Sequence, residues 1–344
     1  MNTPSMGGFG KENNSMTKFL IRRIFLAFII FFFGMLITYS VIRALPTSYV
    51  DKMILEKTAG KQSVKSADEW REQLNKVYGL DKGIIPGYLT WLGNAVRGNF
   101  GDSWLWNVSC IQKFGDVIGY SFFLNVITLL VQFLIGIPLG ILAARRQYGA
   151  ADYTITVFAL ACISLPTFFL ATIFKYLFAV KLGWLPLYGL KGSEYYMHGF
   201  WYKFWDLTRH LIMPVVTLTM LSIGGIMRYT RTNMLEVMNS DYIRTARAKG
   251  LPEKKVINIH AFRNTLIPLI SLMSGILPSM FGGAMITETM YKIPGIGYIS
   301  YQSIIQGDIP FAMFYTAFIL ILTLASIILT DILYAVVDPR VRVN

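Results

Sequence analysis

The sequence has few charged residues and few of the side chains that build metal sites or disulfides. Charged residues make up 15% of the 344, whereas about 25% is usual in a soluble domain. The 3 histidines never form an HExxH arrangement, which disfavours a membrane metalloprotease. Cys110 and Cys162 lie in a polar segment and an apolar run, respectively. They therefore indicate neither a disulfide framework nor a metal site.

The sequence also lacks a phosphate-binding loop of the form G-x-x-x-x-G-K-[S/T]. At the nearest candidate, Gly10-Lys11, Ser5 replaces the first glycine and Glu12 replaces the final Ser or Thr. No nucleophile and base pair occurs within the long apolar runs. We therefore expect no catalytic residues, no metal and no cofactor in this chain.

What the sequence has in excess is apolar residues, at 54%, with a mean hydropathy of +0.49. The net charge of +13 could indicate a nucleic-acid partner. The basic residues, however, gather between apolar runs, as the positive-inside rule requires of membrane proteins. We expect an all-α membrane protein in the lipid bilayer that does not bind nucleic acid.

Six apolar runs are long enough, or nearly so, to cross about 30 Å of hydrocarbon. Only Lys175 is charged within them. After a polar tail at 1–16, residues 17–344 are thus predicted to form one domain of six transmembrane helices. The predicted spans are Ile24–Ile42, Val117–Ala144, Tyr153–Val180, Leu211–Met227, Thr265–Thr287 and Ile309–Thr330.

The distribution of Lys and Arg sets the expected orientation. With the N-terminus inside, 16 basic residues fall in cytoplasmic segments and 5 in the two short external segments. We expect the chain to lie in the plasma or inner membrane, with both termini in the cytoplasm. The external loop then covers about 44–115, and the main cytoplasmic loop about 228–264.

The external loop contains the pattern of a short amphipathic helix. Ser66 and Glu69 form a capping box, and Gly79 suits a left-handed C-terminal cap. One helical face carries Trp70, Leu74, Val77 and Tyr78. We predict a helix of about 12 residues, acting either as a lid or only as packing.

The predicted spans contain small residues at regular spacing and several prolines. Gly136, Gly140 and Ala144 recur every four residues, a spacing that lets membrane helices approach closely. Prolines, which remove backbone hydrogen bonds and kink helices, occur in or beside four spans, at Pro138, Pro166, Pro214, Pro268 and Pro278. Kinked helices around a pathway, or ordinary curvature, would both fit this pattern.

The stretch Leu235–Ile270, predicted to be cytoplasmic, reads as helix, tight turn, helix. Ser240 and Asp241 are good N-cap residues, Gly250 suits a left-handed helix end, and Pro252 suits a first helical turn. A short basic helix held off the membrane by two arms could dock into a cleft of a cytoplasmic partner. A basic patch lying on anionic lipid is the alternative.

Within this stretch, YIRTARAKGL resembles the coupling-loop signature E-A-A-x-x-x-G of binding-protein-dependent ABC permeases. Arg244, Thr245 and Ala246 occupy the E-A-A places, and Gly250 occupies the glycine. The first two depart from the general form, as is usual in the dipeptide, oligopeptide and nickel permease subfamily. Further similar stretches are FLIRRIFLAF, YGLDKGIIPGYLTWLGNAVRGNFGDSW, LGWLPLYG, ETMYKIPGIGY and DILYAVVDPRVR.

The resemblance implies a permease subunit of an ABC importer that forms half of a translocation pathway for peptides. Its implied partners are a homologous second permease, two cytoplasmic ATPases that bind ATP and Mg, and an extracytoplasmic solute-binding protein. It also implies ATPase-coupling roles along the loop. Polar contacts would come from Arg244, Arg247 and Lys249, close approach from Thr245, Ala246 and Ala248, the turn from Gly250, and apolar anchoring from Tyr242 and Leu251.

One acidic residue near a span end is a candidate outer gate. Glu288 follows the fifth predicted span and could line the outer mouth or contact the solute's amino group, or it could be an interfacial carboxylate. An ion-coupled secondary transporter is the alternative function. Such a protein would be expected to carry acidic residues inside its spans, where this sequence has none clearly placed.

Overall fold

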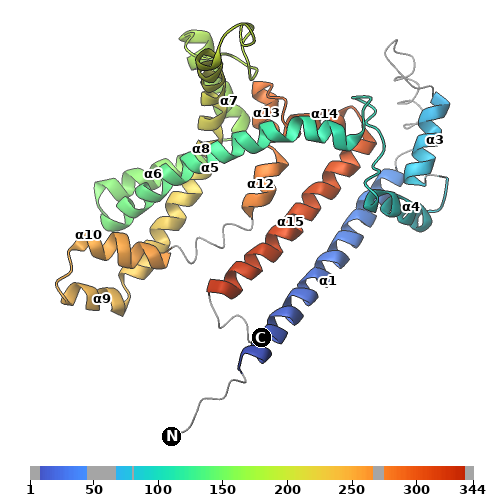
Figure 1. The fold of residues 1–344 in the computed structure, drawn as a ribbon. Coiled ribbons are helices and arrows are strands. Elements are labelled where there is room, and N and C mark those ends of the chain that lie inside the picture. Colours follow the sequence, from blue (N-terminus) through green and yellow to red (C-terminus); the bar gives the residue numbers. More distant parts are fainter. Residues whose placement is uncertain (1–7, 45–66, 80, 266–274, 338–344) are drawn as a thin grey trace. The chain divides into compact units, whose positions relative to one another are not determined.

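The computed structural model describes residues 8–44, 67–79, 81–265 and 275–337. These residues fold into helices joined by turns and loops, with a single isolated β-bridge between Asp102 and Ser109. The predicted all-α class is confirmed (Figure 1). The chain divides into two compact units, one of residues 1–117 with 299–344 and the other of residues 118–298.

The first unit pairs the two ends of the chain. Helix α1 (Gly8–Arg43) packs along α15 (Ile309–Val337), and α4 (Ile84–Val96) lies against both α1 and α3 (Ala67–Tyr78) (Figure 1). Helix α1 begins at Gly8, inside the polar tail predicted at 1–16. A helix already nucleated by an apolar span adds residues at little cost, which explains the extension.

Aromatic side chains fill the core of the first unit. Tyr39, Tyr88 and Trp91 are at most 1% exposed, and the Tyr39 hydroxyl donates a 2.6 Å hydrogen bond to the Tyr78 carbonyl. The 12-residue helix predicted in the external loop is confirmed as α3, which ends at Tyr78 and is followed by Gly79 with φ +59°. Val77 and Tyr78 of its predicted face are buried, whereas the capping residue Ser66 lies outside the described residues.

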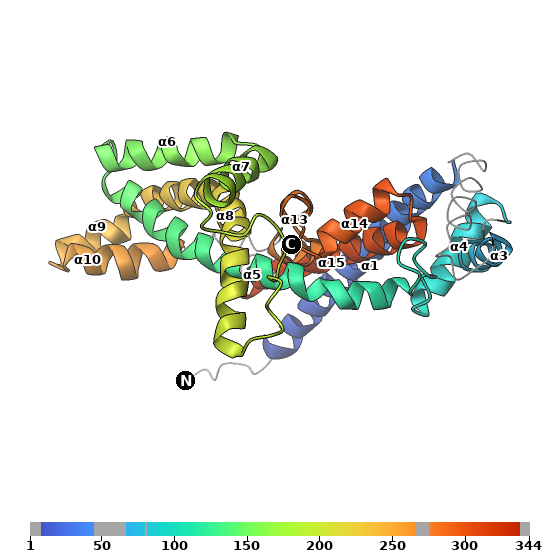
Figure 2. The ribbon, with the colours of Figure 1, turned by 90° about the horizontal axis from the view of Figure 1, so that it is seen from above.

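The second unit is built around two long helices, α5 (Cys110–Arg145), whose first turns belong to the other unit, and α8 (Phe200–Met238). At 1.5 Å per residue the 39 residues of α8 extend about 58 Å, well beyond the hydrocarbon thickness of a bilayer. Helix α6 (Ala150–Ser164) runs beside α8 (Figure 2).

The third predicted span, Tyr153–Val180, is not one straight helix. It consists of α6 followed by α7 (Thr167–Phe174) and the π-helix η1 (Lys175–Lys181), with a bend of 103° between the two halves. The break falls at Leu165-Pro166, because proline cannot donate the next helical hydrogen bond and disfavours helix in the residue before it.

Among the described residues, four helices are long and apolar enough to cross a membrane, and the bent α6–η1 pair would make a fifth. The four lie at Leu20–Val41, Cys110–Arg145, Phe200–Met238 and Ile309–Ile332. Of the predicted span Thr265–Thr287, residues 266–274 lie outside the described residues. The described residues that follow include α12 (Ile276–Gly282) and the start of α13 (Met285–Tyr291). Between the two helices lies Gly283, whose φ is +76°.

The small residues of α5 bring it close to α8, as predicted. A Cβ added to Gly140 would lie 2.6 Å from the Thr230 Cβ and 2.8 Å from the Met227 carbonyl oxygen. One added to Gly136 would lie 3.0 Å from Ile226. Glycine at these positions therefore permits a helix contact that larger residues would push apart.

Candidate functional site

The conspicuous feature beyond the end of α8 is a hairpin of residues 241–255, formed by α9 (Asp241–Ala248) and the short α10 (Glu253–Lys255). Ser240 occupies the N-cap with extended backbone angles, and its hydroxyl donates to the Val237 carbonyl instead of accepting a hydrogen bond from an N–H of α9. Gly250 has φ +74°, as the sequence predicts for the turn. The predicted arrangement of a helix, a tight turn and a second helix is confirmed.

The inner face of α9 packs on the chain itself. Ile243 is 0% exposed and Ala246 is 9% exposed, and both belong to an apolar cluster with Ala144 and Met234 at the ends of α5 and α8. The cluster is completed by the π-helix η2 (Val256–Ala261), through Val256, Ile257 and Ala261. The hairpin is thus anchored by burial of its own apolar side chains, each contributing about 1–3 kcal/mol.

This arrangement corrects the expectation that Ala246 presents a small surface to a partner. Ala246 lies three residues after Ile243, and residues at this spacing share a helix face, so both turn inward. The sequence supplied this signal, but the run of small residues obscured it. Thr245 and Ala248 are the small residues on the exposed side.

The outer face of α9 is polar and basic around one aromatic ring. The ring belongs to Tyr242, which is 49% exposed. Arg244, Thr245, Ala248 and Lys249 are exposed as well. The Thr245 hydroxyl donates to the Asp241 carbonyl, which leaves its methyl group available for packing.

Arg247 holds the two arms of the hairpin together. Its Nη2 donates to Glu253 Oε1 at 2.8 Å and its Nε to Oε2 at 3.2 Å. These hydrogen bonds lower the pKa of Glu253. A carboxyl with a depressed folded-state pKa stabilises the fold above its unfolded pKa, and this contribution disappears as pH falls through the folded value. Because both groups are exposed to solvent, the contribution is small.

A second ion pair, which the sequence analysis missed, joins α6 to α8. Asp152 is 3% exposed and accepts hydrogen bonds from Arg231 Nε at 2.6 Å and Nη2 at 2.8 Å, and from the backbone N–H of Tyr148 at 2.9 Å. The signal was an acid three residues after Gly149, in the first turn of an apolar helix. Because the partners are 79 residues apart, only the fold could pair them.

Glu288 on α13 lies at 0% exposure inside a network of donors. Its Oε1 accepts from the Ser121 hydroxyl at 2.7 Å and the Ala284 N–H at 3.0 Å, and its Oε2 accepts from the Tyr298 N–H at 2.9 Å. Ser121 in turn accepts the Ile296 N–H at 2.7 Å. The interfacial, headgroup-solvated position considered for this carboxylate is not what the structure shows.

Two glycines make room for the Glu288 carboxylate. A Cβ added to Gly295 would lie 2.5 Å from Glu288 Oε2, and one added to Gly297 would lie 3.0 Å from the same atom. The turn between α13 and α14 (Ile296–Ile305) is therefore wrapped closely around the carboxylate, which ties it to Ser121 on α5. The geometry suits a residue that positions this turn.

Comparison with known proteins identifies the kind of chain that carries these features. Residues 136–343 match the family described as binding-protein-dependent transport system inner membrane component. This match covers more than half of the chain. The chain belongs to that family.

Curated relatives align with this permease over nearly its whole length. The oligopeptide transport system permease protein AppB of Bacillus subtilis is 33% identical over 95% of this chain and 100% of its own. The di/tripeptide transport system permease protein DppB of Pseudomonas aeruginosa is 32% identical over 95% and 99%, respectively. The dipeptide transport system permease protein DppB of Alkalihalophilus pseudofirmus is 30% identical over 95% and 100%.

The family match includes several of the features described above. It covers the α5–α8 contact at Gly140, the Asp152–Arg231 pair, the hairpin and Glu288. The permease is a multi-pass membrane protein and a subunit of an ABC importer, as its sequence resemblance implied.

Proposed function

We propose that this permease forms half of an import pathway for peptides and that the outer face of α9 docks on a separate ATPase subunit. The relatives are named for oligopeptide, di/tripeptide and dipeptide transport, which supports the substrate class. The observation that carries the docking proposal is the two-sided character of α9. Its inner face is packed on the chain, and its outer face is exposed and basic around Tyr242.

The proposed assembly contains a homologous second permease, two ATPases that bind ATP and Mg, and an extracytoplasmic binding protein. Arg244 and Lys249 would supply charge, Tyr242 apolar anchoring, and Thr245 and Ala248 close approach. Leu251, which was expected to anchor the partner, packs against the cluster under α9. Gly250 permits the turn, Ala246 fixes α9 from the inside, and Arg247 keeps the hairpin closed through Glu253. Movement of the ATPases would then be transmitted to the transmembrane helices through the apolar cluster under α9.

The six-span count belongs to this proposal. The first, second, fourth and sixth spans would be α1, α5, α8 and α15, the third would be the bent α6–η1 pair, and the fifth would include α12. Both termini would be cytoplasmic, as would the hairpin, while α3 would lie outside. Glu288 would act at the outer mouth by holding the α13–α14 turn in place, without contacting the solute itself.

Labelling of single cysteines tests the orientation. We expect Asn75→Cys on α3 to react with a membrane-impermeant thiol reagent in intact cells, and Lys254→Cys on α10 to react only after the membrane is opened. Both positions are exposed, and the native Cys110 and Cys162 are buried free thiols that give a low background. Reaction of both variants in intact cells would contradict the proposed topology.

Peptide uptake in cells tests the substrate class. Cells lacking this permease should lose binding-protein-dependent uptake of labelled peptides of two to five residues, and restoring the gene should recover it. Uptake of the free amino acids should be unchanged in the same cells, because other carriers supply them. Full peptide uptake in the deletion strain would refute a peptide pathway, and uptake that survives ATP depletion but fails without an ion gradient would favour an ion-coupled carrier.

A further inference from the structure

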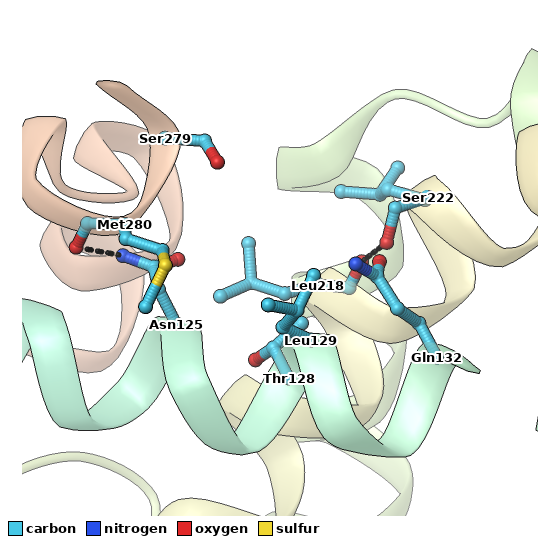
Figure 3. Close-up of a pocket in the computed structure, with 9 residues that line it drawn as sticks. Asn125, Thr128, Leu129, Gln132, Leu218, Ser222, Ser279 and Met280 are labelled. Carbon is cyan, nitrogen blue, oxygen red and sulfur yellow. Dashed lines mark hydrogen bonds between the residues drawn. The ribbon is translucent and has the colours of Figure 1, made fainter. Parts of the chain in front are cut away.

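The second unit contains a cavity of about 290 Å³ between α5, α8 and α12. Figure 3 shows its lining, which includes Asn125, Thr128 and Gln132 from α5, Ser222 from α8 and Ser279 from α12. Its lining residues, all in the described part of the chain, carry no charge. Four apolar side chains complete the wall, namely Leu129, Leu218, Leu221 and Met280.

The cavity lies at the middle of both long helices. Asn125 to Gln132 straddle the midpoint of α5 (Cys110–Arg145), and Leu218 to Ser222 straddle that of α8 (Phe200–Met238). In secondary transporters, substrate sites characteristically lie near the bilayer midplane, beside interrupted helices. Here α12 ends at Gly282, and the backbone breaks at Gly283 before α13.

The three hydroxyl groups in the lining already donate hydrogen bonds to carbonyl groups of their own helices. Thr128 donates to the Leu124 carbonyl at 2.9 Å, Ser222 to the Leu218 carbonyl at 2.8 Å, and Ser279 to the Ile276 carbonyl at 2.8 Å. A hydroxyl that donates to its own helix still has lone pairs to accept with. These three oxygens are therefore acceptors towards the cavity.

The two carboxamides contribute acceptors in the same way. Asn125 Nδ2 donates to the Ser121 carbonyl at 2.9 Å and to the Met280 carbonyl at 3.3 Å, so both of its hydrogens are engaged and Oδ1 remains (Figure 3). Gln132 Oε1 is buried and has no hydrogen-bond partner among the residues that the structure describes. A buried acceptor without a partner costs about 1–3 kcal/mol, which a donor on a ligand would recover.

We propose that this cavity is a contact site for peptides in transit, in which uncharged oxygens accept hydrogen bonds from main-chain N–H groups of the solute. Peptides carry such a donor at every peptide bond except those before proline, so the site would accept varied sequences. The lack of charge keeps the contact weak enough for release, as conduction requires. This inference rests on the proposed peptide pathway and assigns residues to it.

The test uses the complete importer, reconstituted in proteoliposomes with its partner permease, ATPases and binding protein, and measures ATP-driven uptake of trialanine. Gln132→Leu and Thr128→Val should each lower the maximal rate about three- to tenfold, the usual consequence of losing one hydrogen bond. The matched control is Thr208→Val on α8, whose hydroxyl also donates to a carbonyl four residues back but which lies outside the cavity lining.

A second readout reports contact directly. Ser222→Cys should react with a small methanethiosulfonate reagent more slowly when the importer is given trialanine, and not when it is given trialanine methylated at both peptide nitrogens. If wild-type importer takes up trialanine but the cavity variants match Thr208→Val and the labelling rate ignores the peptide, this inference is wrong and the proposed function stands. If wild-type importer takes up no peptide, both are wrong.

Discussion

Ala248→Glu is expected to lower the rate of peptide uptake at least about 100-fold, while the permease still folds and inserts into the membrane. Ala248 is exposed on the outer face of α9, so a larger charged side chain there meets no other part of the described chain. In a docked complex the same side chain would place a carboxylate in a close-packed contact, and leaving a buried charge unpaired costs several kcal/mol. The measurement is peptide uptake together with recovery of the ATPase in pull-downs of the permease.

The comparison with Ala246 makes this prediction specific to the outer face. Ala246→Glu inserts a carboxylate into the apolar cluster with Ile243, so it should lower the thermal stability of the purified permease, whereas Ala248→Glu should not. Ala248→Ser, which keeps the residue small, should behave as wild type. If Ala248→Glu retains both uptake and ATPase recovery, α9 is an ordinary loop and the docking proposal is wrong.

Glu288→Gln is expected to have the second large effect, a loss of about 3 kcal/mol of stability with a matching fall in melting temperature. Both carboxylate oxygens accept hydrogen bonds, from Ser121 and Ala284 on one side and from Tyr298 on the other. An amide offers only one acceptor oxygen, and its NH₂ group must then face a backbone N–H or the Ser121 hydroxyl. At least one buried donor thus loses its partner.

The matched control for this change is Glu194→Gln. Glu194 lies in an exposed loop with its side chain 60% exposed, so the same chemical exchange should leave the melting temperature within about 1 °C of wild type. Thermal unfolding of the purified permease measures both variants. An unchanged melting temperature for Glu288→Gln would show that the carboxylate does not hold the α13–α14 turn.

Features set by a few neighbouring residues were predictable from the sequence. Gly79 and Gly250 both adopt the left-handed conformation expected of a helix end, because only the local backbone decides it. The close approach at Gly140 followed from its four-residue spacing with Gly136 and Ala144. The hairpin of residues 241–255 was found in the same way, from Ser240 at the N-cap position and a turn at Gly250.

Features that depend on distant partners were not predictable. Pro166 indicated a kink, but the 103° bend between α6 and η1 is set by the packing of both halves on other helices. The sequence indicated only that Glu288 is an acidic residue at the end of a span. Its buried position depends on Ser121, which lies 167 residues away. The acceptor oxygens of the cavity likewise come from three separate helices, which no periodicity in one segment could bring together.

Cross-linking between α9 and the ATPase tests the central claim most directly. In membranes containing the complete importer, Ala248→Cys carrying a short photoactivatable cross-linker should attach to an ATPase subunit. Ala150→Cys, exposed at the start of α6 on the same predicted side of the membrane, should not. Attachment from Ala248 alone is the result that this account predicts. A complete importer that transports peptides but gives no cross-link from Ala248 would contradict it.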